Sequence, residues 1–456
     1  MKSWQPRVSG RLTLRAQLRR PWRFSPPALL ALSFLTLILI GGLLLWLPMA
    51  SHGGLGLGQA MFTACSAVTV TGLVVVDTGS VLTGFGQAVV LVLIQLGGLG
   101  LMTFAGLTIL ALGGRLGLGG RRLVREALDQ TDPGDVLVLV GHIAILALSL
   151  ELLGTLLLAL VWVPEMGWGG GLWFSLFHAV SAFNNAGFGL RPDSLMSWAG
   201  QPLVNTVITA LFIIGGLGFT VILDLWRRRR LARLTLHSKL TLAGTAILAL
   251  GGWLLMLGFE WHNPGTLGGL PVADRFWAAW FAAVTPRTAG FNSIDTGALG
   301  MPATLLTMLL MFIGGGSNST ASGIKVSTFM VVLLSTWAIL RGEQQPRLFR
   351  RAVAVAAVFR AYAVVMLSVM LLMLAAFVLV ILQPQMKPLD LLFESFSAFG
   401  TVGLSRGITA ELGAPGQGIL MLLMFVGRIG PLAFAYALAR PNPARVHYTE
   451  ADVQIG

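Results

Sequence analysis

A short motif that ends in glycine occurs four times in this chain, at nearly equal intervals. Each copy has one large apolar residue after its glycine and an aromatic residue ten positions before it. The glycines are separated by 115, 103 and 113 residues. The copies are Thr69-Val70-Thr71-Gly72, Asn184-Asn185-Ala186-Gly187, Arg287-Thr288-Ala289-Gly290 and Gly400-Thr401-Val402-Gly403. A motif that returns at such an interval indicates a chain built from four similar units.

The composition indicates that these units lie in a membrane. Of 456 residues, 55% are hydrophobic and 11% are charged, whereas soluble proteins carry roughly a quarter charged residues. The net charge of +13 comes from short basic runs between apolar segments, a pattern typical of membrane orientation rather than of a nucleic-acid partner. The single cysteine, Cys65, excludes an intrachain disulfide framework, and no Cys/His cluster has the spacing of metal ligands.

Each unit is predicted to contain a crossing helix, a short helix that leads into the glycine motif, and a returning helix. The short segments fall below the ~20 residues that a helix needs to cross a bilayer, so they should enter the membrane and turn back. The four units are predicted at 27–112, 136–230, 239–340 and 352–440, between a basic segment 1–26 and a tail 441–456. The short segments are Gln59–Val70, Leu172–Asn184, Asp274–Arg287 and Leu389–Gly400.

Basic residues gather where this topology predicts cytoplasm. Besides those in 1–26, they are Arg115, Arg121, Arg122 and Arg125; Arg227–Arg230, Arg233 and Lys239; Arg341, Arg347, Arg350 and Arg351; Arg440 and Arg445. The opposite ends of the predicted spans carry few positive charges, and the positive-inside rule then places both termini in the cytoplasm. The fold predicted is an all-α membrane protein with eight transmembrane helices.

Four re-entrant loops of this kind predict a cation pathway. Irregular backbone is tolerated at membrane depth only where protein covers it or where it lines a water-filled cavity, and four loops meeting on one axis satisfy both conditions. The short helices would point their negative C-terminal ends at the axis, and glycine can adopt the positive φ that turns carbonyls inward. Such carbonyls can replace the hydration shell of K⁺. The predicted ion-binding residues are Val70, Thr71, Gly72, Asn185, Ala186, Gly187, Thr288, Ala289, Gly290, Thr401, Val402 and Gly403.

Charged residues close to the loops have two interpretations. Asp77, Asp193 and Asp295 follow the first three motifs by five or six residues, so they either form an acidic mouth or cap turns. Three arginines also lie near the loops, and we expect them to pair with carboxylates because free guanidinium groups would repel cations. They are Arg191, Arg287 and Arg406.

The third returning helix, Pro302–Ile339, is too long for one span and is interrupted by glycines and small polar residues at 314–323. It does not match a phosphate-binding loop, because no strand precedes it and Gly-x-x-x-x-Gly-Lys-Ser/Thr is absent. The alternative to an intramembrane loop is a kinked helix. The glycine pairs at Gly97 and Gly215 in the first two returning helices are predicted to serve close packing.

Arg428 lies in the middle of the fourth returning helix, Gly416–Ala439. A charge at that depth costs several kcal/mol unless it is paired, and we expect it to hold the 314–323 loop through carbonyls, Asn318 or serines. Glu151 is the rival partner, and Lys325 is either part of the gate or an interfacial anchor. The predicted gate residues are Gly314, Gly315, Gly316, Ser317, Asn318, Ser319, Thr320, Gly323, Lys325 and Arg428.

Six motifs in the same order resemble the potassium-translocating subunits of the Trk/Ktr/HKT superfamily, and most closely the Ktr type. They are TVTGL (69–73), NNAGF (184–188), RTAGF (287–291), GTVGL (400–404), GGGSNSTASGIK (314–325) and GRIGPL (427–432). The resemblance implies four M1–P–M2 units around a pseudo-fourfold pore, an intramembrane loop that obstructs it, and a homodimer. It also implies a cytoplasmic RCK-type regulatory partner, so that a nucleotide would act only through that partner. Glycine in all four motifs favours potassium over sodium.

The expected function is therefore potassium uptake across a bacterial cytoplasmic (inner) membrane. A secondary transporter coupled to protons or sodium is the alternative, although the chain offers few midplane titratable groups beyond Glu151, Glu394 and Arg428. A membrane enzyme is not expected, since no nucleophile–base pair or metal motif occurs. Channel-like or coupled flux and the dimer surface stay open, with the tail Arg440–Gly456 as one candidate surface.

Overall fold

The computed structural model describes residues 26–111, 133–343, 345–349 and 351–438. The predicted N-terminal basic segment (except Pro26), the basic residues Arg115–Arg125 and Arg350, and the tail from Arg440 lie outside the described residues. Within the described ranges the chain is mostly helical. Its one sheet there is an antiparallel hairpin of β1 (Arg347–Leu348) and β2 (Arg351–Ala352), with Leu348 opposite Arg351.

In chain order the helices can be described as four successive groups. The first group is α1 (Pro26–Trp46), α2 (Leu57–Val68) and α3 (Gly84–Ala111), and the second is α5 (Pro133–Phe183), α6 (Pro202–Leu217) and α7 (Phe219–Arg228). The third is α8 (Leu236–Glu260), α9 (Val272–Val284), α10 (Met301–Phe312) and α11 (Val326–Leu340). The fourth is α12 (Val355–Leu382), α13 (Pro388–Gly400), α14 (Ala414–Ile429) and α15 (Pro431–Leu438). Short 3₁₀ turns lie at Pro48–Ala50, Met196–Trp198, Leu231–Arg233 and Leu267–Gly269.

Three of the returning helices are broken. The sequence predicts the break between α10 and α11, where residues 313–325 are not helical. It does not predict the breaks at Gly218, where α6 and α7 bend by 93°, and at Gly430 between α14 and α15. Continuous helices over Leu203–Trp226 and Gly416–Ala439 are therefore wrong. Both glycines have φ 94° with ψ near 136°, which no α-helix can contain.

Helix α5 contains two of the predicted elements. Its 51 residues include Gly167, whose φ of 77° and ψ of 169° mark a sharp kink. The crossing helix predicted at Val136–Val163 therefore runs through a tight turn into the short helix predicted at Leu172–Asn184. The short helices of the other groups are α2, α9 and α13, which are separate elements.

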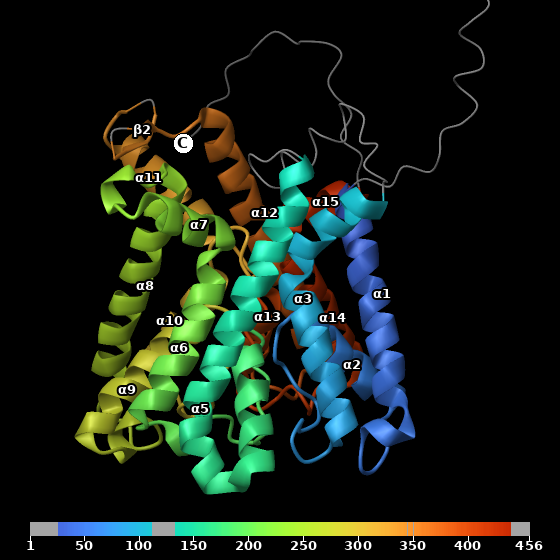
Figure 1. The fold of residues 1–456 in the computed structure, drawn as a ribbon. Coiled ribbons are helices and arrows are strands. Elements are labelled where there is room, and N and C mark those ends of the chain that lie inside the picture. The colour runs from blue at the N-terminus through green and yellow to red at the C-terminus, as the bar shows by residue number, and fades with distance from the viewer. Residues whose placement is uncertain (1–25, 112–132, 344, 350, 439–456) are drawn as a thin grey trace, which may run out of the picture.

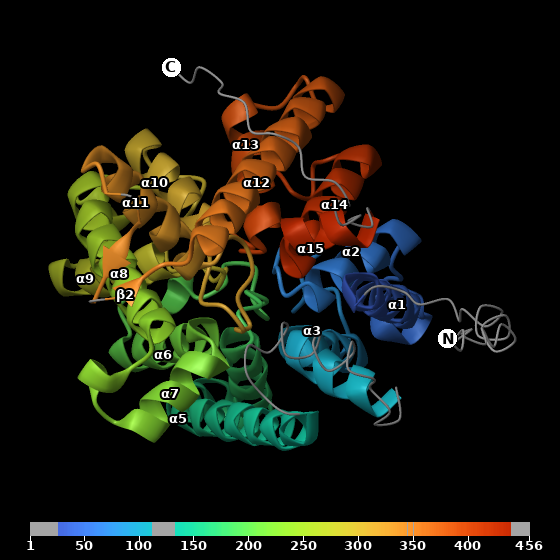
Figure 2. The same ribbon diagram turned by 90° about the horizontal axis from the view of Figure 1, so that it is seen from above.

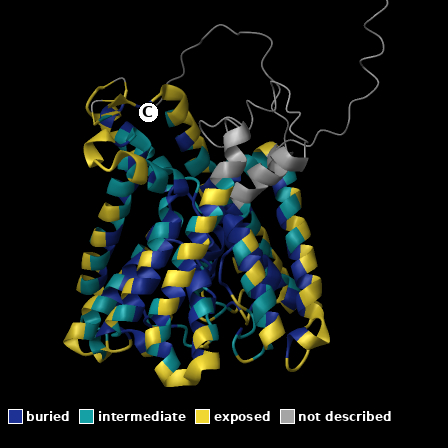
Figure 3. Ribbon diagram, viewed as in Figure 1, coloured by how far each residue is buried: buried dark blue, intermediate teal, exposed yellow. Residues whose placement is uncertain are grey.

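The four groups of helices surround a common centre (Figures 1 and 2). Buried residues concentrate at this centre, and exposed residues cover the outer faces and the ends of the helices (Figure 3). Many exposed residues on the outer faces are apolar, such as Leu43, Leu160, Leu254 and Leu374. Among the described helices, α1, α5, α8 and α12 are long and apolar enough to cross a membrane, and the bent pair α6–α7 is a fifth candidate. An apolar exterior around a partly polar centre suits a lipid environment.

Candidate ion-binding site and the segment beneath it

The four glycine motifs meet in one place. Gly72, Gly187, Gly290 and Gly403 all line one open cavity of about 440 Å³. A Cβ atom on each glycine would collide with the backbone of the next loop in chain order, and the fourth loop closes on the first. These contacts run from Gly72 to Ala186, from Gly187 to Gly290, from Gly290 to Val402 and from Gly403 to Thr71. The loops therefore form a closed ring that only glycine fits.

The loop backbones adopt conformations that ordinary residues avoid. The ring glycines have φ between 68° and 94°, and in each loop the residue two positions earlier also has positive φ. Those residues are Val70 (57°), Asn185 (59°), Thr288 (73°) and Thr401 (48°). A non-glycine residue there costs of order 1–3 kcal/mol, so the surrounding fold must impose the shape. Repeated strain of this kind at one place points to a functional site.

Hydrogen bonds from the short helices hold each loop in the same way. The amide immediately before the ring glycine donates to a carbonyl near the end of the preceding helix. The pairs are Thr71 to Ser66 (2.8 Å), Ala186 to Ser181 (2.8 Å), Ala289 to Thr285 (2.9 Å) and Val402 to Ser397 (2.8 Å). None of these four acceptor residues was predicted from the sequence. A serine or threonine five or six positions before each glycine was the signal that could have identified them.

The ring has no cluster of side chains of the kind that binds a metal ion. No group of three or more His, Cys, Asp or Glu residues that could hold a metal ion occurs in the part of the chain that the structure describes. Helices α2, α5, α9 and α13 end at the loops, and their C-terminal ends carry partial negative charge. Such a site suits a monovalent cation, whose hydration shell neutral oxygens can replace.

Acidic residues at the mouth both line the cavity and cap turns. The Asp77 carboxylate accepts a hydrogen bond from the Ser80 amide (2.8 Å), and Asp295 accepts one from the Gly297 amide (2.8 Å). Both residues also line the cavity, so each of them caps a turn and also contributes a carboxylate to the cavity lining. Asp193 is not among the lining residues; its carboxylate accepts from Ser197 Oγ (2.6 Å).

The three arginines near the loops differ in their partners. Arg406 Nε lies 2.6 Å from Asp390 Oδ1, which is the predicted pairing with a carboxylate of a short helix. Arg191 Nε lies 3.7 Å from Asp193 Oδ1, and both side chains are exposed, so this pair adds little.

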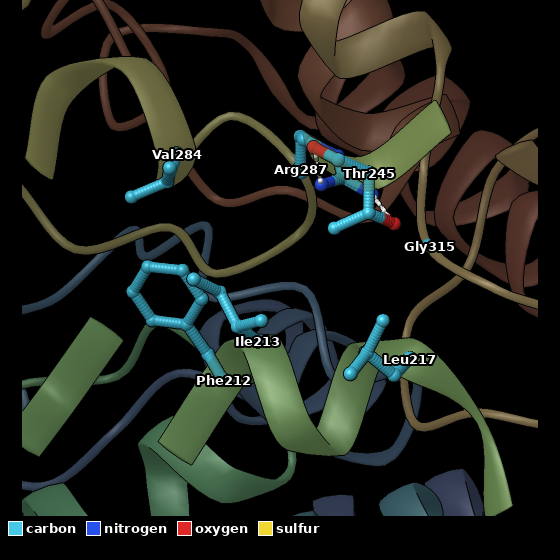
Figure 4. Close-up of a pocket in the computed structure, with 8 residues that line it drawn as sticks. Phe212, Ile213, Leu217, Thr245, Val284, Arg287 and Gly315 are labelled. Atoms are coloured by element: carbon cyan, nitrogen blue, oxygen red, sulfur yellow. Dashed lines mark hydrogen bonds between the residues drawn. The ribbon is translucent and has the colours of Figure 1, made fainter. Parts of the chain in front are cut away.

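Arg287 does not have the predicted carboxylate partner. Its guanidinium donates to Thr245 Oγ1 (3.2 Å) and to the Gly314 carbonyl (3.5 Å). It lines a small cavity with Phe212, Leu217 and neighbouring residues (Figure 4). The prediction was therefore wrong about the partner. Arg287 does not project freely into the ring either, because the residue is only 8% exposed.

The non-helical segment 313–325 packs directly against the ring. Thr320 Oγ1 donates to the Asn185 side chain (2.8 Å) and to the Phe183 carbonyl (3.2 Å). A Cβ atom on Gly314 would meet Thr288, and one on Gly323 would meet the Gly400 backbone. The segment therefore contacts three of the four loops, whereas a merely kinked helix would not leave the helical path.

The break at Gly218 makes room for this segment. The Gly316 amide donates to the Gly216 carbonyl (2.7 Å), and the Phe219 amide donates to the Asn318 carbonyl (3.0 Å). Polar backbone groups that the broken helices leave unpaired are thus satisfied by the segment, as burial requires.

Arg428 contacts the segment and not Glu151. Its guanidinium is 3% exposed and donates to the Thr320 carbonyl and to Ser322 Oγ (3.0 Å). It also donates to the carbonyls of Gly97 (2.5 Å) and Gly98 (3.2 Å) in α3. The predicted contact through carbonyls and a serine is present, but Asn318 is not a partner of Arg428.

Two further charged side chains of this region, Glu151 and Lys325, also have partners. Glu151 accepts hydrogen bonds from Gln95 (3.2 Å) and Asn184 (3.1 Å). Lys325 Nζ donates to the carbonyl of Ala321, which lies in the segment (2.7 Å). Gly97 and Gly215 lie against the carbonyls of Val68 and Phe183, which confirms their predicted role in close packing.

Four glycine loops that meet at the centre of a helical assembly with an apolar exterior are an arrangement that suits a membrane protein. The chain belongs to the TrkH family of cation transport proteins, whose family model matches residues 28–448.

Proteins similar to this chain over nearly its full length are potassium uptake proteins. It is 49% identical to the Ktr system potassium uptake protein B of Bacillus subtilis, over 95% of this chain and 97% of that protein. It is 44% identical to the protein of the same name from Vibrio alginolyticus, over 94% and 95% of the two chains. It is 38% identical to the potassium/sodium uptake protein NtpJ of Enterococcus hirae, over 95% and 98%. The potassium transporter TrkH from Vibrio parahaemolyticus has a similar fold, with a TM-score of 0.72 and 18% identity over 92% of this chain and 86% of that one.

Proposed function

We propose that this chain is the membrane subunit of a potassium uptake system and that K⁺ crosses through the ring of four glycine loops. The observation that carries the proposal is that Gly72, Gly187, Gly290 and Gly403, more than 100 residues apart in sequence, line one cavity. The names of the relatives, two of which are potassium uptake proteins and one a potassium/sodium uptake protein, support the same ion class.

The chemistry of the ring favours a large, weakly hydrated monovalent ion. K⁺ gives up its water at a lower cost than Na⁺, and rigid carbonyl dipoles can replace that water. Positive φ at all four ring glycines and the clashes that any Cβ would cause support a backbone held in one shape. In this proposal the ions are held by the oxygens of Val70–Gly72, Asn185–Gly187, Thr288–Gly290 and Thr401–Gly403.

The segment 313–325 is the proposed gate. It lies against the ring, and three cationic side chains donate to its carbonyls: Arg287 to Gly314, Lys325 to Ala321 and Arg428 to Thr320. A full positive charge near the path would raise the energy of K⁺ there by Coulomb repulsion. The segment would thus oppose permeation by its bulk and by the charges that hold it. Opening requires that it move away from the ring.

The wider assembly follows from the sequence pattern and the family resemblance. We place the chain in a bacterial cytoplasmic membrane, with eight spans as four M1–P–M2 units and both termini in the cytoplasm. It would function as a homodimer with a cytoplasmic RCK-type subunit. A nucleotide would act through that subunit, and K⁺ would be the transported ion rather than a resident cofactor.

Rubidium uptake tests the function. A bacterial host that lacks its own potassium uptake systems should regain growth at low external K⁺ when it produces this chain with a regulatory subunit. Purified protein in liposomes should accumulate ⁸⁶Rb⁺ under a negative-inside potential. Absence of Rb⁺ flux in both assays, with the protein shown to be folded and inserted, would refute the proposal.

A secondary transporter remains the second candidate, and the buried carboxylates are what it would need. Glu151 and Glu394 are each buried within the protein and hydrogen-bonded to neutral amides or hydroxyls. If they carried coupling protons, Rb⁺ uptake would acidify the liposome lumen and Glu151→Gln would abolish that acidification. Uptake with no proton movement favours the uncoupled pathway.

A further inference from the structure

The hydroxyl groups of four residues at or near the ends of the short helices make two different kinds of contact with the ring. The carbonyls of Ser66, Ser181, Thr285 and Ser397 each accept a hydrogen bond from the amide just before the ring glycine, and that of Thr285 also accepts one from the Gly290 amide (3.3 Å). The side chains of these four residues divide the ring into two halves. Loops one and four, which are neighbours in the ring, share one arrangement, and loops two and three share the other.

In loops one and four the hydroxyl accepts a hydrogen bond from the ring glycine itself. The Gly72 amide donates to Ser66 Oγ (3.0 Å), and the Gly403 amide donates to Ser397 Oγ (3.1 Å). Within the described residues, the carbonyls of the next residues, Leu73 and Leu404, receive no hydrogen bond. Among the described residues, no protein donor therefore competes with a cation for these two oxygens.

In loops two and three the hydroxyl instead donates to the carbonyl that follows the ring glycine. Ser181 Oγ donates to the Phe188 carbonyl (2.8 Å), and Thr285 Oγ1 donates to the Phe291 carbonyl (2.8 Å). Both hydroxyls belong to buried residues of the supporting helices, at 0% and 3% exposure. These two carbonyls are therefore directed into the protein, and part of their negative charge is already neutralised by a donor.

We propose that only two of the four loops coordinate the ion at the outermost cation site of the pathway, through the carbonyls of Leu73 and Leu404. The corresponding carbonyls of Phe188 and Phe291 do not coordinate it, because they accept hydrogen bonds from Ser181 and Thr285. The inference rests on the proposed function and adds positioning residues to it. A cation at the level just beyond the ring glycines would sit off the axis, closer to loops one and four, with water completing its shell on the other side. The inner levels keep the fourfold arrangement.

The position of a heavy monovalent ion tests this directly. The full-length protein prepared in Rb⁺ should give anomalous or difference density displaced toward Leu73 and Leu404 at the outermost level. Density centred on the axis there would overturn the inference. If the inner levels held no monovalent ion at all, the proposed function itself would fail, so the two failures are distinguishable in one experiment.

Paired substitutions test the role of the hydroxyls. In Ser181→Ala/Thr285→Val both donors are lost, two more carbonyls become free to coordinate, and the external Rb⁺ concentration for half-maximal uptake should fall by roughly threefold or more. Ser181→Thr/Thr285→Ser keeps both hydroxyls and should behave like the unaltered protein. A purely structural role would predict equal loss of uptake in the two pairs, or no shift in either.

The other half of the ring supplies the matched control. Ser66→Ala/Ser397→Ala removes an acceptor of the glycine amides and frees no carbonyl, so it should leave the outermost ion displaced as before. If this pair lowered the half-maximal Rb⁺ concentration as much as the donor pair, the assignment of roles to the two halves would be wrong. Should any variant fail to fold, the ion position in the unaltered protein still decides the matter.

Discussion

Gly290 illustrates how little freedom one residue of the ring has. Its φ is 79°, and a Cβ atom would collide with the Val402 carbonyl and lie 3.1 Å from the Gly187 Cα. Alanine there would cost about 1–2 kcal/mol in backbone strain alone and would push two loops apart. We expect Gly290→Ala to reduce ⁸⁶Rb⁺ uptake by at least about tenfold, since misplaced carbonyls lose the geometry that replaces water.

Gly251 provides the control for that substitution. It lies within α8, and a Cβ atom there would meet nothing within 4 Å. Gly251→Ala should fold as well as the unaltered chain or slightly better, because alanine favours a helix by up to about 1 kcal/mol over glycine. Equal uptake by both alanine variants would show that the ring does not depend on its glycines.

Arg428 joins the segment 313–325 to α3 through a single side chain. Its donors reach Thr320 and Ser322 on one side and the Gly97 and Gly98 carbonyls on the other. Hydrogen bonds from a charged group contribute about 1.5–3 kcal/mol each, so their loss should release the segment. We predict that Arg428→Gln raises Rb⁺ flux without the regulatory subunit by about tenfold, measured in liposomes.

The control for Arg428 is an arginine that carries the same charge at the surface. Arg227 lies in the last turn of α7 and is exposed, so Arg227→Gln should leave basal flux unchanged. Flux through Arg428→Gln that equalled the unaltered protein, with and without the regulatory subunit, would remove Arg428 from the gate.

A comparison of the two helix breaks, at Gly218 and Gly430, distinguishes the effect of backbone strain from the effect of contact with the segment. Their backbone angles agree within a degree, but a Cβ atom on Gly218 would strike the Ser317 carbonyl, whereas one on Gly430 would meet nothing within 4 Å. Both alanine variants should lose similar stability to strain. Only Gly218→Ala should displace the segment and raise basal Rb⁺ flux, by severalfold over Gly430→Ala. Equal basal flux in the two variants would mean that the segment does not restrict the path.

These two helix breaks could not be predicted from the sequence, unlike the interruption between α10 and α11. The interruption at 314–323 can be predicted from the sequence, because four glycines and several small polar residues in ten positions have low helix propensity. A single Gly218 or Gly430 in an apolar helix reads as a packing residue, which is how Gly97 and Gly215 do behave. What breaks the helix at Gly218 is the segment seated beside it, and that neighbour is more than 90 residues away in sequence.

The functional site could also be predicted from the sequence only in part. The ring glycines and the contact of Arg428 with the segment could be predicted, because strained backbone and a charge at membrane depth each have few physical solutions. The partner of Arg287 could not, since Thr245 and Gly314 satisfy it with neutral oxygens that no charge pattern reveals. The two hydroxyl arrangements at Ser66 and Ser181 also escape sequence analysis, because the residue type is the same and only the geometry differs.

The ring ties together all four quarters of the chain, so an ion bound there should stabilise the whole protein. A ligand that binds only the folded state at 100 times its Kd adds about 2.7 kcal/mol to the free energy of unfolding. In detergent at constant ionic strength, the Tm should therefore rise with K⁺ or Rb⁺ and rise less with Na⁺, compared with choline. The shift should vanish in Gly290→Ala and persist in Gly251→Ala, because only the former alters the ring. A Tm that responds equally to all four cations would mean that general salt effects, and not ion binding at the ring, hold the four quarters together.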